Sequence, residues 1–261
     1  MRRSDLKKEV AKYFFSLPKE VFPDKLKTRT TVLLSGSAGW GITEGSDSLA
    51  DWDIHVLLAD KEHAAYVKSG RSLVIDDKKH SPSVFVQVRN KNWLLGRLHK
   101  NETSALYLWI YTHGLFIRDN LSVETLLAKQ LAKFKADLPA LRKAQHIQFS
   151  VRRLDTASCA ARGLTVAVGI NRAEMVKLAL QTYSLIKSQP YPYSKWLAKH
   201  VKGLSPAGAR LVALCDRCLF ETDLAKISIA AKEIRDFMER EMEKAAGPNR
   251  WIHCWWEFNE N

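Results

Sequence analysis

The chain has 261 residues, of which 46% are hydrophobic and 26% are charged, and its formal net charge is +13. This composition is ordinary for a globular protein, no apolar run approaches the length of a membrane span, and four cysteines in a chain this long do not form a disulfide framework. Because the first residues also lack the apolar stretch of a signal peptide, we expect a cytoplasmic protein with one large or two modest domains.

The first half of the sequence alternates predicted helices with short apolar strands. Apolar residues at spacings of three and four predict an amphipathic helix over 4–17, and the largely apolar 102–113 predicts a buried one. A further helix is expected over 61–68. The predicted strands are 32–34, 54–58, 73–75, 84–88 and 115–119.

From Ser122 the pattern becomes almost wholly helical. One apolar stripe runs from Leu127 to Leu138, and Pro139 is expected to restart the helix, with Asp137 as its cap. Further helices are predicted over 151–168, 172–187 and 223–244. We therefore predict two domains, 1–120 and 121–261.

Two carboxylates, Asp51 and Asp53, stand at the beginning of the second predicted strand. Residues two apart on a strand share a face, so both carboxylates are expected to point the same way. Carboxylates held this close repel each other unless a cation lies between them. Hard oxygen ligands at this spacing suit Mg²⁺, which completes its coordination with phosphate and water.

A glycine-rich turn follows the first predicted strand. Gly36 allows the backbone to approach a ligand closely, and with Ser37 it leads into a predicted helix start that can present N–H groups to a phosphate. Gly41 extends the turn. Either motif alone is common on solvated loops and strand ends, whereas the ordered pair between two strands indicates a phosphate and metal site.

This order of residues resembles the Gly-Ser…Asp-x-Asp signature of the nucleotidyltransferase-fold superfamily, to which DNA polymerase β and the antibiotic nucleotidyltransferases belong. The interval before Asp51 is a little longer than usual, so 44–49 resembles a small insertion. The resemblance implies an α/β (α+β) nucleotidyltransferase domain with a short mixed sheet, followed by an α-helical bundle domain. It also implies an active site in the cleft between them, with Asp51 and Asp53 as catalytic metal ligands and Gly36 and Ser37 on the nucleotide phosphates.

A second, looser resemblance lies in the helical half. The helix around 173–186 and the later Lys195-Trp196 pair are similar to the C-terminal domain of bacterial antibiotic adenylyltransferases and related uncharacterised nucleotidyltransferases. There a lysine grips the nucleotide triphosphate and an acidic residue contacts the acceptor. The resemblance implies nucleotide binding by Lys195 and an acceptor contact by Glu174. The alternative for each is an ordinary residue on a solvated helix face.

The superfamily carries a third carboxylate on a later strand, and this sequence departs from that pattern. The corresponding strand reads Val-Phe-Val-Gln-Val, so Phe85 and Gln87 take the inward positions. Gln87 can contact the acceptor but cannot remove a proton. Asp76, Asp77 or Glu102 could supply the missing group.

Together these features predict Mg²⁺-dependent transfer of a nucleoside monophosphate, with ATP as the expected donor, to an acceptor with release of pyrophosphate. Basic clusters at Lys25-Lys27-Arg29, Arg89-Lys91 and Lys195-Lys199-Lys202 favour RNA or another polyanion as acceptor, with a small molecule as the alternative. The charge could also serve solubility alone. A catalytically impaired nucleotide-binding or regulatory module is the rival hypothesis.

Three further features have mainly structural interpretations. Cys215 and Cys218 are expected to be two partly buried helix cysteines, because no second ligand pair accompanies them. His55 is expected to be a hydrogen-bonded structural histidine that faces away from the carboxylates. The tryptophan-rich tail 251–258 is expected to pack on the helical bundle, with a partner surface or base-stacking platform as the alternative.

Overall fold

The structure is a computed structural model that describes residues 2–40 and 51–259, without the side chains of 101–103. The chain divides into two compact units, Met1–Ala132 and Lys133–Asn261. This division falls inside one helix, twelve residues beyond the boundary at 120 that the sequence suggests. The domain limits of 1–120 and 121–261 stay a prediction.

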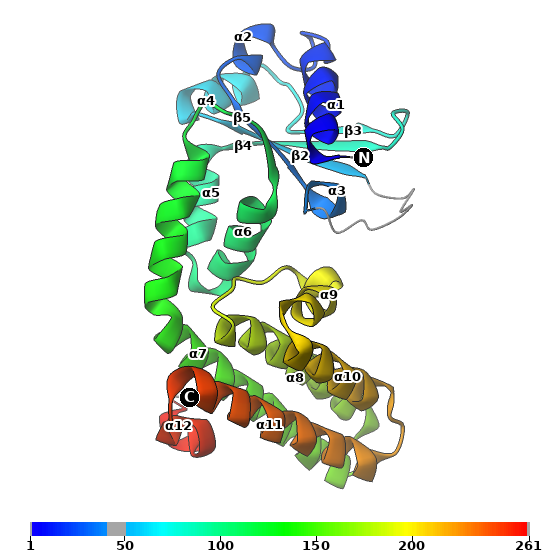
Figure 1. Cartoon of the computed structure of the whole chain (residues 1–261). Coiled ribbons are helices and arrows are strands. Elements are labelled where there is room, and N and C mark those ends of the chain that lie inside the picture. The colour runs from blue at the N-terminus through cyan, green and yellow to red at the C-terminus, as the bar shows by residue number, and fades with distance from the viewer. Residues whose placement is uncertain (1, 41–50, 260–261) are drawn as a thin grey trace. The chain divides into compact units, whose positions relative to one another are not determined.

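A five-stranded mixed sheet is the centre of the first unit (Figure 1). Its strand order is β3-β4-β2-β1-β5, with β2 and β4 parallel and the other neighbours antiparallel. The strands are β1 (Thr31–Ser35), β2 (Trp52–Leu58), β3 (Val74–Asp77), β4 (Val84–Asn90) and β5 (Leu115–Asp119).

Helices cover both faces of this sheet (Figure 1). The helices and helical turns are α1 (Arg3–Ser16), α2 (Asp24–Lys27), α3 (Gly36–Trp40), α4 (Asp60–Lys68), α5 (Lys91–His99) and α6 (Asn101–His113). On one face Val10 and Phe14 of α1 form a buried cluster with Ile54, Val56 and Val86 of the central strands. The opposite face carries the polar side chains of β2 and β4, and α5 and α6 lie on that side.

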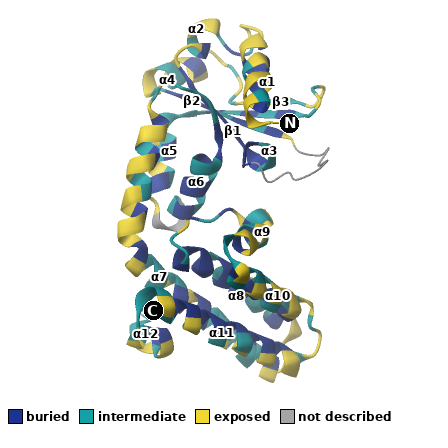
Figure 2. Cartoon of the chain, viewed as in Figure 1, coloured by how far each residue is buried: buried dark blue, intermediate teal, exposed yellow. Residues whose placement is uncertain are grey.

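The second unit is helical apart from its turns. It contains the second part of α7 (Val123–Ala161), then α8 (Thr165–Ile186), α9 (Ser194–Leu204), α10 (Pro206–Phe220), α11 (Leu224–Ala246), α12 (Arg250–His253) and the 3₁₀ helix η1 (Trp255–Phe258). Figure 2 shows buried residues along the inner sides of α8 and α11. Met175, Tyr183, Leu211, Ile234 and Met238 belong to this core. The predicted fold class, a short mixed sheet followed by a helical region, is confirmed.

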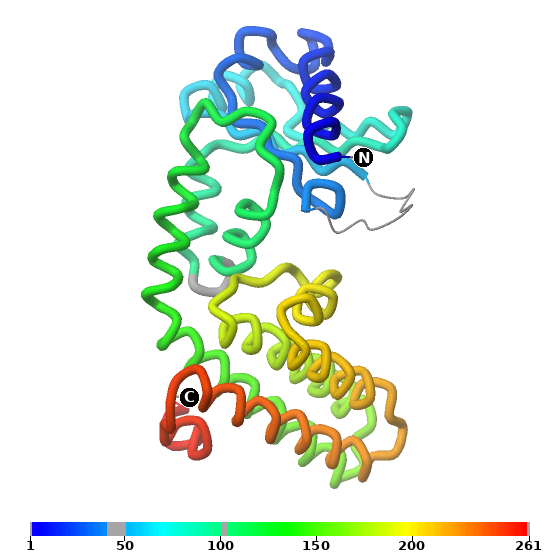
Figure 3. Tube along the Cα trace, viewed as in Figure 1, coloured from blue at the N-terminus to red at the C-terminus, as the bar shows by residue number. Residues whose placement is uncertain are grey.

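Two helix boundaries differ from the expectations. Pro139 does not restart a helix, because it lies inside α7. The trace of this helix can be followed in Figure 3. Buried apolar residues occur on both sides of the proline, Phe134 and Leu138 before it and Ile147 and Phe149 after it, so burial outweighs the single backbone hydrogen bond that proline removes.

The prediction of one helix over 151–168 is also wrong, because α7 ends at Ala161. Gly163 has φ +72°, its N–H donates to the Ala160 carbonyl, and the N–H of Leu164 donates to the Cys159 carbonyl. This is the Schellman arrangement that ends a helix at a glycine. α5 was not expected from the sequence at all, because 91–99 lacks a clear apolar period.

The apolar tail of the chain packs as the sequence predicts. Ile252 is fully buried in the helical core, and Trp251 is packed against the same core. The ring of His146 donates to the Ile252 carbonyl over 2.9 Å and lies edge-on to Trp251. Within the described residues, no helix combines the length and hydropathy that a membrane span needs.

Candidate functional site

Asp51 and Asp53 lie where β2 begins. Asp51 directly precedes the strand and is exposed, while Asp53 is its second residue and is half-buried. The intervening Trp52 is buried on the opposite face, where its ring packs against those of Tyr13 and His80. Strand alternation therefore directs Asp51 and Asp53 away from the Trp52 face, so that both project from the same side of the sheet.

Gly36 brings the backbone unusually close to Asp53. β1 and β2 pair with Ser35 opposite Asp53, and Gly36 follows at once as the first residue of α3. A Cβ on Gly36 would lie 2.3 Å from Oδ2 of Asp53, and its φ of +69° is one that only glycine adopts without strain. Glycine is therefore required at this position on two independent grounds. Ser37, the next residue, is half-buried in the first turn of α3.

Asp51 has a hydrogen-bond partner that the sequence analysis missed. The hydroxyl of Ser83 donates to Oδ1 of Asp51. The backbone N–H of Trp52 donates to the Ser83 carbonyl over 2.9 Å, which continues the parallel pairing of β2 with β4. Predicting Ser83 as the partner of Asp51 would have required the register of β2 against β4. The sequence alone does not give the register of two strands that are far apart in the chain.

No acidic residue of β4 joins these carboxylates. Phe85 pairs with Asp53 and Gln87 pairs with His55, so both share the face of Asp53, as the alternation predicts. Gln87 lies opposite His55, two residue pairs further along the strands than Asp53 and Phe85. Its proposed contact with an acceptor stays a prediction.

The two aspartates of β3 lie on different faces. Asp77 accepts a hydrogen bond from the hydroxyl of Tyr13 over 3.1 Å, so it belongs to the α1 face and cannot complete the site. Asp76 pairs with Phe85 and shares the face of Asp53, but it is separated from Asp53 by β4 and is bound to Lys78 over 3.5 Å. Gly41, the segment 44–49 and the Glu102 side chain lie outside what the structure describes.

His55 corrects one prediction and confirms another. It lies two residues after Asp53 and therefore shares its face rather than facing away. Its Nδ1 is 3.1 Å from the hydroxyl of Tyr111 on α6, so it is the hydrogen-bonded structural histidine that the sequence predicts. Burial, with a smaller contribution from nearby Arg89, lowers the pKa of His55 to about 4. The imidazole is therefore neutral at pH 7.

Of the two candidates in the helical unit, Lys195 is exposed and Glu174 is half-buried. Lys195 is in the first turn of α9, with its ammonium 5.1 Å from the centre of the Trp196 ring. The indole of Trp196 donates to the Tyr193 hydroxyl over 3.1 Å. Glu174 on α8 forms an ion pair with Lys177 over 3.2 Å. The roles of Lys195 on nucleotide and Glu174 on acceptor stay predictions.

The three basic clusters differ in what they present to solvent. Lys27 is only 5% exposed, because its ammonium binds the Phe15 and Leu17 carbonyls and the Asp24 carboxylate. The expectation that it belongs to a binding surface is therefore wrong. Lys91 donates to the Leu121 carbonyl over 2.8 Å.

The α9 cluster is an exposed stripe. Lys195, Lys199 and Lys202 follow one another at spacings of four and three on this helix, and all three are exposed. Residues at these spacings lie on one side of a helix, so the three ammonium groups form a single basic surface.

No cluster of three or more histidine, cysteine or acidic side chains suited to a metal occurs among the described residues. The thiols of Cys215 and Cys218 are free and buried on α10, and burial raises the pKa of both. This burial agrees with the expectation that both are structural cysteines of a helix. A metal at Asp51 and Asp53 would therefore need ligands from substrate and water.

Comparison with known proteins finds matches among solved structures alone. No family model matches the chain, and no curated protein does. Among solved structures, a nucleotidyltransferase-like protein from Exiguobacterium sibiricum aligns at 13% identity with a TM-score of 0.48, over 93% of this chain and 80% of that chain.

Proposed function

We propose that the protein is a Mg²⁺-dependent nucleotidyltransferase that transfers a nucleoside monophosphate, with ATP as the expected donor, to an acceptor and releases pyrophosphate. The observation that carries this proposal is the close approach of Gly36 to Asp53. A Cβ on this glycine, which directly follows β1, would overlap the Asp53 carboxylate, and a second carboxylate, Asp51, projects from the same face. A phosphate held along the Gly36 backbone would be adjacent to both carboxylates.

The donor set fits Mg²⁺. Two carboxylates are what this ion takes from a protein when it retains waters and binds the phosphates of a substrate. Asp51 and Asp53 would hold the metal, which when bound supplies positive charge to the triphosphate. The remaining contacts to the nucleotide come from three residues. Gly36 leaves room for the phosphates, Ser37 offers them a hydroxyl, and Lys195 supplies a further positive charge.

The missing carboxylate on β4 does not exclude catalysis. Phosphoryl-group transfer depends mainly on positioning and on electrostatic stabilisation of the phosphate oxygens, with little covalent chemistry for the protein. Gln87 can orient an acceptor hydroxyl by a hydrogen bond without removing its proton. The same absence motivates the second candidate, a nucleotide-binding module that holds ATP and Mg²⁺ without turnover.

The charge of the chain favours a polyanionic acceptor such as RNA. The net charge of +13 and the exposed α9 stripe would attract phosphates, whereas a cationic small molecule would be repelled. A small-molecule acceptor remains the alternative that an acceptor screen distinguishes.

Calorimetry of ATP binding with and without Mg²⁺ tests the metal site. We expect Mg²⁺ to strengthen ATP binding to the natural protein and Asp53→Asn to abolish that gain. Asp76→Asn is the matched control, because Asp76 is on the same face of the sheet but on β3, which β4 separates from the strand of Asp53. Equal ATP affinity in the presence and absence of metal for natural protein and Asp53→Asn alike would refute the assignment.

Pyrophosphate release separates an enzyme from a binder. With labelled nucleoside triphosphates, Mg²⁺ and cellular RNA or small molecules, we expect acceptor-dependent release that is lost in Asp51→Asn. Lys195→Ala should weaken triphosphate binding about tenfold, while Lys232→Ala, which removes an equally exposed lysine of α11, should not. Retained ATP binding without product for any acceptor would favour the binding module.

A further inference from the structure

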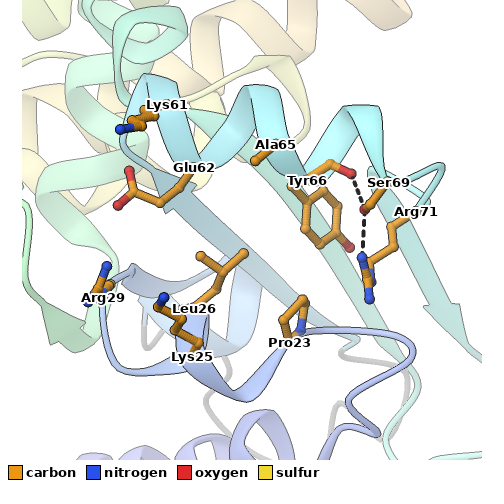
Figure 4. Close-up of a pocket in the computed structure, with 10 residues that line it drawn as sticks. All are labelled: Pro23, Lys25, Leu26, Arg29, Lys61, Glu62, Ala65, Tyr66, Ser69 and Arg71. Carbon is orange, nitrogen blue, oxygen red and sulfur yellow. Dashed lines mark hydrogen bonds between the residues drawn. The ribbon is translucent and has the colours of Figure 1, made fainter.

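A second basic site lies at the other end of the sheet. A pocket of about 500 Å³ opens between α2 and α4 (Figure 4). The strands place it away from the aspartates: β1 and β2 pair from Thr31 opposite Leu57 to Ser35 opposite Asp53, and the pocket borders the Thr31–Leu57 end. Four residues of strand separate these two ends, about 13 Å at 3.3 Å per residue.

The lining combines positive charge with an apolar floor. Lys25, Arg29, Lys61 and Arg71 contribute four cations against the single carboxylate of Glu62. In Figure 4, Lys25, Arg29 and Lys61 lie toward one end and Arg71 toward the other. Between them the pocket is lined by Pro23, Leu26, Ala65 and Tyr66.

Three of these cations have no acidic partner. Among the residues that the structure describes, no carboxylate lies within 4.0 Å of the side-chain nitrogens of Lys25, Arg29 or Lys61, although other exposed lysines, such as Lys133, form such pairs. Like charges gathered around one pocket repel one another, and an anion bound there relieves that repulsion.

The walls that carry these cations are held by buried hydrogen bonds. The Lys27 ammonium of α2 donates hydrogen bonds to the Phe15 and Leu17 carbonyls. The Thr30 hydroxyl donates to the Leu57 carbonyl over 2.7 Å. On the other wall, the hydroxyl of Tyr66 is 3.2 Å from the Val21 carbonyl and 3.0 Å from that of Ser72. The pocket is thus preformed, which lowers the entropic cost of binding.

We propose that this pocket binds a ribose phosphate, with the phosphate near Lys25, Arg29 and Lys61 and the organic part on the apolar floor. Multiple cations converging on one anion favour phosphate over a singly charged carboxylate, and the volume suits a group of nucleotide size. The ligand can be a nucleotide unit of an RNA strand or a free mononucleotide. This site is separate from the proposed catalytic carboxylates, and its occupancy does not require that the protein be an enzyme.

A charge-matched pair of triple variants tests the proposal. Lys25→Gln/Arg29→Gln/Lys61→Gln removes the unpartnered cations of the pocket. Lys8→Gln/Lys12→Gln/Lys129→Gln removes three exposed lysines outside it, so both variants lower the net charge of +13 by three. Circular dichroism and urea unfolding check both folds, and Lys61→Gln alone serves if the pocket variant does not fold.

The first measurement is the affinity for a labelled single-stranded RNA between about 50 and 200 mM salt. We expect the pocket variant to bind at least tenfold more weakly than the control variant at low salt. Its log–log salt slope should be shallower by about 0.7, because the pocket holds one phosphate and each lost phosphate contact on a single strand accounts for about 0.7.

The second measurement is AMP binding without Mg²⁺ in the Asp53→Asn background, which removes the metal-dependent site. A selective loss of RNA affinity identifies the RNA strand as the source of the phosphate, and a selective loss of AMP affinity alone identifies a free nucleotide. If neither ligand distinguishes the pocket variant from the control variant, the proposal is overturned. Since neither measurement involves turnover, a failed catalytic proposal would leave this result unaffected.

Discussion

The two units of the chain use their polar side chains in different ways. In the helical unit, the buried carboxylate of Glu241 is bound by Lys187 and Lys244, and the buried hydroxyl of Ser184 donates to the Leu180 carbonyl over 3.1 Å. In the sheet unit, Asp51 and Asp53 lie at the beginning of β2, beside Gly36, on which a Cβ would overlap the Asp53 carboxylate. Groups of the first kind stabilise packing, whereas the second arrangement is suited to a ligand.

Gly36→Ala should produce the largest effect on chemistry if this contrast is right. The new methyl group would overlap Oδ2 of Asp53, so we expect pyrophosphate release to fall at least about 100-fold. Gly70→Ala is the matched control: its φ of +73° is equally unfavourable for alanine, but nothing lies within 4 Å of the added Cβ. Both variants should lose about 1 kcal/mol of stability from the backbone alone. Equal activity in the two variants would show that contact with Asp53 has no catalytic importance.

Met238→Ala should reduce stability strongly and change ligand binding little, the opposite of what we expect for Gly36→Ala. Met238 is fully buried in the core of the helical unit, so its truncation leaves a cavity that costs about 2–5 kcal/mol of unfolding free energy. Urea unfolding measures this loss. At temperatures where the variant stays folded, ATP affinity should remain within about threefold of the natural value. A comparable loss of stability in Asp51→Asn would contradict the contrast, since exposed Asp51 contributes little to packing.

His55, in the sheet unit, should make a smaller contribution to the free energy of unfolding, and this contribution should depend on pH. Its pKa is lowered from 6.5 to about 4 by burial and by Arg89, so the unfolded chain binds a proton on this residue at a higher pH than the folded chain does. The stability associated with neutral His55 is therefore complete above pH 6.5 and declines as the pH falls toward 4, by up to about 3 kcal/mol.

Urea unfolding of the natural protein and His55→Gln from pH 7.5 to 4.5 measures this contribution. The remaining titrating groups are shared, so the difference between the two proteins isolates residue 55. We expect their unfolding free energies to converge as the pH falls. Parallel curves across this range would show that the pKa of His55 is not lowered in the fold.

Local sequence patterns were sufficient to predict most helices and strands and the common face of the two aspartates. The apolar runs of β1, β2 and β4 and the stripe of α1 appear in the sequence because burial imposes its period on each element separately. The common face of Asp51 and Asp53 follows from strand geometry alone. That same rule placed His55 beside them, so the expectation that His55 faces away was an error in applying the pattern rather than missing information.

The tertiary structure decided what lies next to what. The hydroxyl partner of Asp51, and which of Asp76 and Asp77 shares the face of Asp53, depend on pairing between segments distant in sequence. The burial of Lys27 depends on carbonyls ten and twelve residues away, so its charge looked like part of a surface until the fold showed it to be a structural anchor. Periodicity reports which face of an element is buried, but pairing and burial of single polar atoms are set by non-local contacts, which a single sequence does not display.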